Sequence, residues 1–394
     1  MADVVTATRL ANARANSLDA AVGGAHVLVT TGAGGVGKTT VAAALGVAAA
    51  WEGRRTLVLT IDPARRLAQA MGLAELADVP IRVELPEDQD DGAPPERGEL
   101  WAMMLDTQTT FDRLIERHAT SPGKARAIQA NRIYRTLSST LSGTQEYMAM
   151  ERLHELHEDG DWDLLVVDTP PTRSALDFLD APKRITSFLE GRLLRLLLKP
   201  GMAAGRGIGR VVGAGATAFM RVAGKVTGMD LLEDLADFFR NFEGMYEGFK
   251  DRAEQVLELL RRPDSQFVIV TSPDPPPLRE AKFFLERLEQ EGLHAAGVVV
   301  NRIRPEVPRD PSDASLRRAI DGLGDDLADR AVAGALHLVG EVRNLAARQR
   351  RDVAQALFGV EVRTLVEVPL LGGDVHDLHG LRAIATNLTT GRAR

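Results

Sequence analysis

The feature that most constrains the fold is a glycine-rich segment that joins a short apolar run to an alanine-rich stretch. Residues 32–40 are G-A-G-G-V-G-K-T-T, which fits the pattern G-x-x-x-x-G-K-S/T. The apolar run before it, Val27–Thr31, predicts a strand, and Lys38–Trp51 after it predicts a helix. A strand, a loop of this pattern and a helix in this order are typical of α/β proteins with a parallel sheet.

Further short apolar runs recur along the chain between helical patterns. They predict six more strands, at residues 55–61, 100–105, 164–167, 267–271, 297–300 and 364–368. Their near-continuous hydrophobicity is typical of strands that are buried on both faces, and the helices between most of them indicate parallel crossovers. The sequence therefore predicts a doubly wound, mostly parallel α/β sheet of the P-loop NTPase type, with an inserted α-helical subdomain.

Two stretches are too long for simple crossovers and carry helical stripes of apolar residues, such as Phe111 with Leu114 and Phe238 with Met245. The expected division is an N-terminal extension at 1–24, a first core part at 25–106, a helical insertion at 107–161, a core strand with its following loop at 162–176, a helical subdomain at 177–263 that contains a glycine-rich segment at 200–228, and a second core part at 264–394.

Composition narrows the classes of function. The formal net charge of −7 provides no positive field for nucleic acid, so no nucleic-acid partner is expected. Cysteine is absent, which excludes disulfides and cysteine metal sites. Neither a secretory signal nor a run of roughly 18 apolar residues is visible, so we expect a cytoplasmic protein that does not span a membrane.

The glycine-rich loop is expected to bind phosphate. Successive backbone N–H groups and the start of the following helix can converge on phosphate oxygens. Lys38 would reach the β- and γ-phosphates, and the Thr39 hydroxyl would bind Mg²⁺. The alternative is a glycine-rich turn without a ligand. The residues expected to bind nucleotide in this loop are Gly34, Gly35, Val36, Gly37, Lys38, Thr39 and Thr40.

Two aspartates follow predicted strands at the edge where open α/β sheets bind ligands. Asp168 is expected to contribute to the Mg²⁺ site through water, although a strand-end aspartate can also be a simple turn residue. Asp62 is expected to hold the attacking water and to contribute to the metal site, with an Asp-Pro turn as the alternative. The chain lacks an Asn/Thr-Lys-x-Asp motif for guanine, which favours ATP as the nucleotide.

Together these motifs resemble the ArsA-type ATPases, which include arsenite-pump ATPases and targeting factors for tail-anchored membrane proteins. The resemblance covers nearly the whole chain after about residue 25, and its wording is closest to the actinobacterial branch. It is carried by GAGGVGKTT at 32–40, TIDPARRLAQAMGL at 60–73, VVDTPPTRSALDFL at 166–179, VVVNRI at 298–303 and VEVPLL at 366–371.

The resemblance implies several roles. Asp62 would lie in switch I and residues 168–172 in switch II, which report the bound nucleotide to a helical client-binding subdomain. Asn301 and Pro369 would flank adenine, although Asn301 could equally be a strand-end turn residue and Pro369 a strand terminator. The family also implies a homodimer, or a heterodimer with a paralogous ATPase.

The chain departs from the family pattern at three points. Ala33 stands where relatives usually have a second lysine that reaches the partner's phosphates, so Arg65, Arg66 or a lysine-bearing partner would have to supply that charge. Without cysteine, the metalloid site of arsenite pumps and the zinc clasp of some targeting factors are excluded. In switch II, T-R-S-A at 172–175 replaces the more familiar T-G-H-T.

The resulting hypothesis is a Mg²⁺-dependent ATPase whose nucleotide cycle changes a helical surface that binds a hydrophobic protein client or a membrane-associated partner, so the cytoplasmic protein could also lie at a membrane. The glycine-rich segment at 200–228 is either part of such a surface or a flexible linker. One rival is a nucleotide-binding regulatory or chaperone subunit with little hydrolysis of its own. A second, a partition-type ATPase acting on DNA, is disfavoured by the sequence pI near 5.7.

Overall fold

The structure is a computed structural model of the whole chain. The residues it describes are 17–62, 66–85, 97–132, 134–135, 144–169, 234, 237–238, 241, 245–306 and 325–390.

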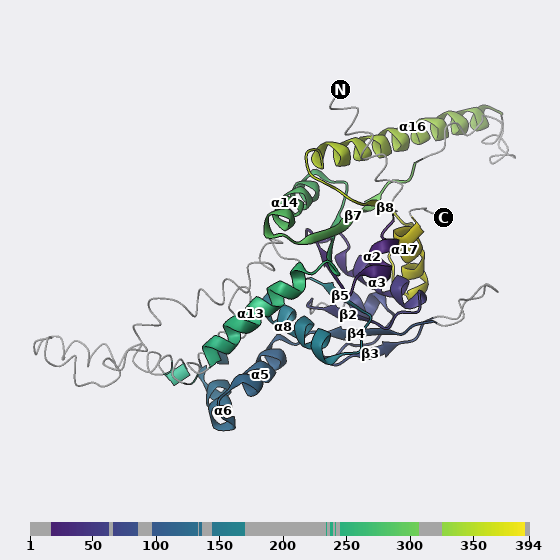
Figure 1. Cartoon of the computed structure of the whole chain (residues 1–394). Helices are drawn as coiled ribbons and strands as arrows, with labels where there is room; N and C mark the ends of the chain where they lie inside the picture. Colours follow the sequence, from purple (N-terminus) through teal and green to yellow (C-terminus); the bar gives the residue numbers. More distant parts are fainter. Residues whose placement is uncertain are drawn as a thin grey trace, which may run out of the picture.

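The centre of the molecule is an eight-stranded sheet with the order β3-β4-β2-β5-β1-β6-β7-β8 (Figure 1). The strands are β1 (Val27–Thr31), β2 (Thr56–Thr60), β3 (Ile81–Val83), β4 (Leu100–Met104), β5 (Leu164–Asp168), β6 (Ser265–Thr271), β7 (His294–Ile303) and β8 (Leu365–Pro369). Neighbouring strands run parallel except for β3, which pairs antiparallel with β4. The predicted fold class, a mostly parallel α/β sheet, is thereby confirmed, and β3 is an edge strand that was not predicted.

The strand order reverses at β1. The next strand in the chain, β2, lies on one side of β1, beyond β5, whereas β6 lies on the other side. In open α/β sheets this reversal opens a crevice at the carboxyl ends of the strands. All five residues of β1, β2 and β5 are buried. Burial on both faces explains why these strands are continuously apolar instead of alternating.

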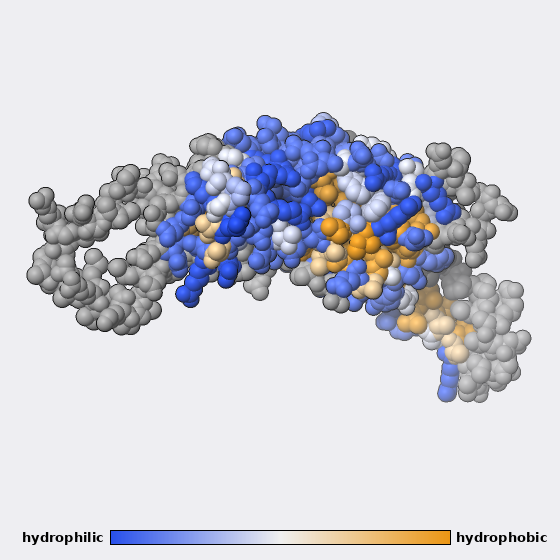
Figure 2. Space-filling model, turned by 90° about the horizontal axis from the view of Figure 1, so that it is seen from below, coloured by the Kyte–Doolittle hydropathy of each residue, from blue (hydrophilic) through white to orange (hydrophobic). Residues whose placement is uncertain are grey.

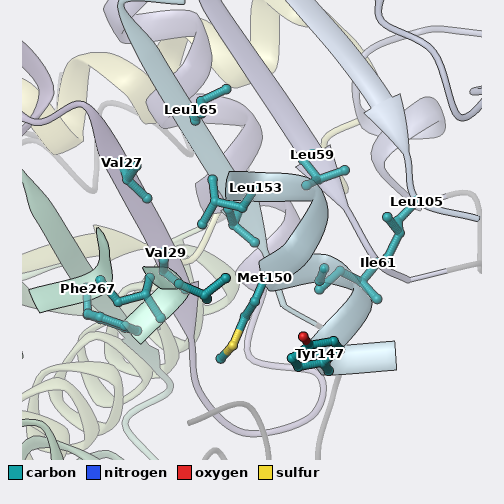
Figure 3. Packing of buried hydrophobic residues seen from close by; sticks show 14 of the residues in the cluster. Val27, Val29, Leu59, Ile61, Leu105, Tyr147, Met150, Leu153, Leu165 and Phe267 are labelled. Atoms are coloured by element: carbon teal, nitrogen blue, oxygen red, sulfur yellow. The ribbon is translucent and has the colours of Figure 1, made fainter. Parts of the chain in front are cut away.

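Helices cover both faces of the sheet (Figure 1). One face packs against α2 (Asp19–Gly24), α3 (Lys38–Trp51), α4 (Arg66–Ala70) and α17 (Leu378–Thr390). The other packs against α5 (Thr107–His118), α8 (Thr144–Asp159), α13 (Tyr246–Arg261), α14 (Pro275–Glu291) and the end of α16 (Asp325–Ala356), while α6 (Pro122–Ala130) contacts α5. Figure 3 shows side chains of α8, among them Met150 and Leu153, meeting those of the sheet.

The helix boundaries follow from local sequence. Asp106 precedes α5, and its carboxylate accepts a hydrogen bond from the backbone N–H of Thr109 at 2.6 Å. Ser121 does the same for the N–H of Lys124 at the start of α6. α14 begins with prolines and ends at Gly292, whose left-handed backbone is typical of a helix C-terminus.

The predicted divisions fall on the structure as follows. Part of the extension at 1–24 is packed, because Leu18 and Val22 are fully buried in the α3 face. The stretch 107–161 carries α5, α6 and α8, and Phe238 and Met245 are buried in the same core as α8. Most of 177–263, including the glycine-rich segment at 200–228, lies outside the described residues.

Figure 2 shows the hydropathy of one face of the molecule, which is mostly hydrophilic, with hydrophobic areas to the right of its centre and at the lower right. Across the described ranges, no helix combines the length and apolar character needed to cross a membrane.

Candidate functional site

The glycine-rich loop leaves β1 at the centre of the sheet. Gly32, Gly35 and Gly37 have φ values of 147°, 78° and 96°, which residues with a side chain rarely adopt. Gly32 also passes close to β6, since a Cβ there would lie 1.9 Å from the carbonyl oxygen of Val270. The loop therefore needs glycine at all three positions for its backbone conformation, and at Gly32 for space as well.

Lys38, the first residue of α3, folds back over the loop. Its Nζ donates hydrogen bonds to the carbonyl oxygens of Gly32 and Ala33, both at 3.0 Å. Burial lowers the pKa of Lys38, whereas the nearby Asp168 carboxylate acts in the opposite direction. An ammonium group poised at the loop, with carboxylates close by, suits an anionic ligand that arrives together with a metal ion.

Asp168, at the end of β5, is fully buried beside α3. Its Oδ2 accepts hydrogen bonds from the hydroxyls of Thr39 at 2.8 Å and Thr60 at 2.9 Å. Its Oδ1 has no hydrogen-bond partner within the described parts of the chain. Burial raises the pKa of Asp168 to about 6, although the two hydroxyls and Lys38 act in the opposite direction.

These residues fit a magnesium ion at the phosphate site. Mg²⁺ in proteins usually keeps several waters and takes one or two protein oxygens together with phosphates. The Thr39 hydroxyl, on a residue that lines the cavity, would be a direct ligand, and the Asp168 carboxylate behind it, with Oδ1 unpartnered among the described residues, would accept from a metal-bound water. Asp168 therefore fits an indirect role at the metal better than direct coordination.

Asp62 follows β2 by two residues and is 8% exposed. Its backbone N–H donates to the Thr60 hydroxyl at 3.2 Å, and its Oδ2 lies 3.7 Å from Nη1 of Arg66. Thr60 thus contacts both aspartates, with its hydroxyl bridging the backbone of Asp62 and the carboxylate of Asp168.

The loop opens into a cavity of about 690 Å³ that extends along the carboxyl ends of β7 and β8. Asn301, at the end of β7, donates from Nδ2 to the carbonyl oxygen of Val36 at 2.8 Å. The residues that line the cavity come from the phosphate loop, α4, the ends of β7 and β8 and the loop after β8, and they include Lys38, Thr39, Thr40, Asp62, Arg66, Asn301, Arg302, Pro369, Leu370, Leu371 and His376.

Most of the predicted site residues come together here. Gly35, Gly37, Lys38, Thr39, Thr40, Asp62, Asn301 and Pro369 line the one cavity, and Asp168 lies directly behind Thr39. Gly34 is exposed at the tip of the loop and Val36 is buried beneath it. Arg65 and switch II after Thr169 lie outside the described residues.

Sequence reasoning missed Thr60 and Arg302. Neither residue was assigned a role, although both lie in segments that carry the family resemblance, Thr60 in 60–73 and Arg302 in 298–303. Their contacts depend on neighbours that are distant in sequence, since Thr60 meets Asp168 and Arg302 meets Gly35. The available signal was their position at the carboxyl ends of strands, next to residues already under consideration.

Comparison with known proteins identifies the family. The sequence profile of the anion-transporting ATPases, ArsA, matches residues 25–322. The chain belongs to the ArsA ATPase family. The resemblance expected from the motifs is thereby confirmed.

Individual relatives of this ArsA-family chain are distant. A protein of Aquifex aeolicus named "Putative arsenical pump-driving ATPase 1" is 25% identical over 290 residues, which cover 71% of this chain and 64% of that protein. "ATPase BagA" of Mycobacterium tuberculosis is 24% identical over 383 residues, 93% of each chain. "ATPase GET3B" of Arabidopsis thaliana is 24% identical over 319 residues, 75% of this chain and 69% of that one.

The family match also places the chain among relatives that are named ATPases. The chain spans slightly less than two thirds of the length of the Aquifex relative, which is 64% covered. The reaction, partners and client of the present chain are therefore proposed from its own residues.

Proposed function

We propose that this chain binds Mg²⁺ and ATP in the cavity beside the glycine-rich loop and hydrolyses the γ-phosphate bond. The observation that carries the proposal is the hydrogen bond of 2.8 Å between Thr39 and the buried Asp168, next to a cavity that is lined by Lys38 and by glycines of the loop. Thr39 and the water-linked Asp168 would hold Mg²⁺. When bound, the ion supplies positive charge that neutralises the phosphate oxygens.

Asp62 is proposed as the residue that orients the attacking water. The water oxygen forms a bond to the γ-phosphorus, the bond from that phosphorus to the β,γ-bridging oxygen breaks, and the proton of the water passes to the Asp62 carboxylate. ADP and inorganic phosphate are the products. Asp62 lies in the cavity wall, and contacts with Thr60 and Arg66 restrain it. Both features support this role, because phosphoryl transfer depends mainly on positioning and charge.

Asn301 and Pro369 are proposed to flank the adenine base. Both line the cavity, and Pro369 is followed in the chain by Leu370 and Leu371, which also line it and whose apolar side chains suit the face of a purine. The Asn301 amide is held by the loop carbonyl of Val36, so its orientation is set before a base enters.

The charge that relatives place at the position of Ala33 is proposed to come from Arg66 or from a partner chain. Arg66 lines the cavity and pairs with Asp62, with a side chain that is 56% exposed and thus able to turn. We propose a dimer, either of two identical chains or with a paralogous ATPase. Ala33 also supports a second candidate, a nucleotide-binding subunit that hydrolyses ATP only with such a paralogue.

Coupling to a client is the remaining part of the proposal. β5 carries Asp168 at its end and leads directly into switch II, while α8, which precedes β5, packs against α13 on the opposite face from α3. A change around Asp168 on nucleotide binding thus has a short covalent route to the helical region. We propose that this region binds a hydrophobic client or a membrane-associated partner.

Two substitutions test the reaction. Lys38→Ala should weaken Mg²⁺·ATP binding roughly 100-fold, because it removes a charged phosphate donor. Asp62→Asn should retain binding and lower the rate of phosphate release roughly 100-fold or more. Calorimetry measures binding, and phosphate release is followed for each variant alone and with a paralogous chain.

Asp251→Asn is the matched control for charge, since Asp251 is an exposed carboxylate on α13. The role of Asp62 is wrong if Asp62→Asn loses binding and turnover to the same degree. The whole proposal is wrong if the wild-type chain does not bind Mg²⁺·ATP. Turnover that needs the paralogue would favour the second candidate.

A further inference from the structure

The end of β7 has an irregular backbone. Arg302 has a φ of 60°, and within the described ranges it is the one residue other than glycine with a positive φ. The register of the β7–β8 ladder shifts at the same place, between Asn301 and Ile303. A left-handed conformation at a residue with a long side chain is unfavourable and persists where surrounding contacts enforce it.

The irregularity directs two neighbouring side chains onto the phosphate loop. Nη1 of Arg302 donates to the carbonyl oxygen of Gly35 at 3.1 Å, and Nδ2 of Asn301 donates to the carbonyl oxygen of Val36 at 2.8 Å. The two residues are also joined to each other, because the backbone N–H of Arg302 donates to Oδ1 of Asn301 at 3.0 Å. In a regular strand, adjacent side chains would point to opposite faces of the sheet.

The fit between β7 and the loop is close. A Cβ at Gly37 would lie 2.2 Å from Nδ2 of Asn301, so the loop can approach the amide only because residue 37 is glycine. With Lys38 on the carbonyls of Gly32 and Ala33, side-chain donors hold four of the loop's peptide groups. A donor on a carbonyl fixes the plane of that peptide, and hence the direction of the N–H on its other side.

We propose that Arg302 is a positioning residue that fixes the amides of the phosphate loop, and that it acts on the phosphate end of the nucleotide and not on the base. The proposal rests on the ATP site proposed above. Its physical basis is that an N–H group aimed at phosphate before binding needs no reorganisation on binding. Asn301 then links the base end of the cavity to the same loop.

The test compares two ligands that share phosphates and differ in the base. Arg302→Met retains most of the side-chain length and removes every donor. If Arg302 holds the loop, the variant should lose affinity for Mg²⁺·ATP and for Mg²⁺·tripolyphosphate by the same factor, roughly threefold to tenfold. If Arg302 instead contacts the base, the loss should appear with ATP and be absent with tripolyphosphate, which overturns the proposal.

Two further variants separate the side chain from the backbone. Arg302→Gly adopts the left-handed conformation readily, so it should fold well and show the same loss for both ligands; wild-type affinity in this variant would overturn the proposal. Arg351→Met removes an exposed arginine on α16 and should bind both ligands as the wild type does. A wild-type chain that binds neither ligand refutes the ATP site itself, whereas unchanged binding in Arg302→Met refutes only the role of Arg302.

Discussion

The two faces of the sheet are packed in different ways. The face under α3 is filled by small residues, since α3 alone buries Ala42, Ala43, Ala44, Ala49 and Ala50. The opposite face is filled by large ones, among them Tyr134, Tyr147, Phe267 and Phe284 (Figure 3). Small side chains let a helix lie close to the sheet, so the helix that starts at Lys38 is held near the strands. On the opposite face, the large side chains fill the space between the sheet and the region where α8 packs against α13.

A buried carboxylate from each face, Glu151 and Asp168, shows a second difference between them. On the larger face, Glu151 of α8 is 4% exposed and its Oε1 lies 2.6 Å from Nε of Arg252 on α13. On the α3 face, Asp168 has hydroxyl partners in place of an arginine. Burial raises the pKa of both groups. The comparison indicates that Glu151 serves packing through a direct ion pair, whereas Asp168 has Lys38 nearby but no direct ion-pair partner among the described residues.

Removing Glu151 should have the largest effect on stability. Glu151→Ala leaves Arg252 buried with one remaining carboxylate, Glu158, whose side chain is 50% exposed. The free energy of unfolding should fall by about 3–5 kcal/mol, measured by urea denaturation. Glu158→Ala is the control and should cost less than about 1 kcal/mol. Equal losses in the two variants would contradict the distinction between the buried and the exposed partner.

The double variant Glu151→Leu with Arg252→Leu sharpens this prediction. Replacing both members of a buried ion pair by apolar residues is often close to neutral. We therefore expect it to recover most of the stability lost in Glu151→Ala. If the stability is not recovered, the ion pair also fixes the angle between α8 and α13, in addition to neutralising its own two charges.

A pair of glycines tests the packing of the two faces. A Cβ at Gly46 of α3 would lie 2.4 Å from Cγ2 of Val58 and 3.3 Å from Cδ1 of Leu100, whereas one at Gly248 of α13 would be 3.5 Å from its nearest neighbour. Gly46→Ala should destabilise the chain by about 2 kcal/mol through overpacking. Gly248→Ala should be neutral or gain up to about 1 kcal/mol in helix propensity. Similar melting temperatures for both variants would contradict the close packing of α3.

The elements that the sequence predicted best are those governed by local pattern. The helix Lys38–Trp51 has the predicted bounds, and Asp168 ends its strand as expected, because apolar runs and glycine loops are local signals. The three-residue edge strand Ile81–Val83 was too short to give a pattern. The Glu151–Arg252 pair joins residues 101 positions apart, and such pairs depend on how helices pack, which no local pattern records.

The same limit applies within the site. The phosphate loop and both aspartates were visible as motifs and strand ends. The backbone conformation of Arg302 was not, since arginine gives no sign of a positive φ and the shift depends on the pairing of β7 with β8. The role of Thr60 in holding two aspartates likewise follows from the parallel register of β2 and β5, in which Thr60 faces Asp168.

Asp168→Asn should have the smallest effect on stability among these variants. It should raise the free energy of unfolding, whereas Glu151→Ala and Gly46→Ala lower it. The pKa of Asp168 is about 6 in the folded chain against an ordinary 3.8, so folding favours the protonated form. The folded state is therefore penalised as the pH rises from about 4 to 6, and the penalty persists at neutral pH. The amide removes it, so the variant should be more stable than the wild type by about 1 kcal/mol at pH 7. This is less than the roughly 3 kcal/mol that the pKa difference alone represents, because the amide also lacks a partner on one side.

The pH dependence is the decisive measurement for this variant. Urea denaturation without nucleotide should show the advantage of Asp168→Asn at pH 7 disappearing as the pH falls and changing sign by about pH 4, where the wild-type carboxyl is protonated as well and only the cost of the amide remains. Added Mg²⁺ and ADP should stabilise the wild type more than the variant, because the charge that is unfavourable in the empty site becomes favourable beside a cation. A variant that is less stable than the wild type at every pH would mean that the carboxylate serves packing, as Glu151 does, and the contrast between the two faces would fail.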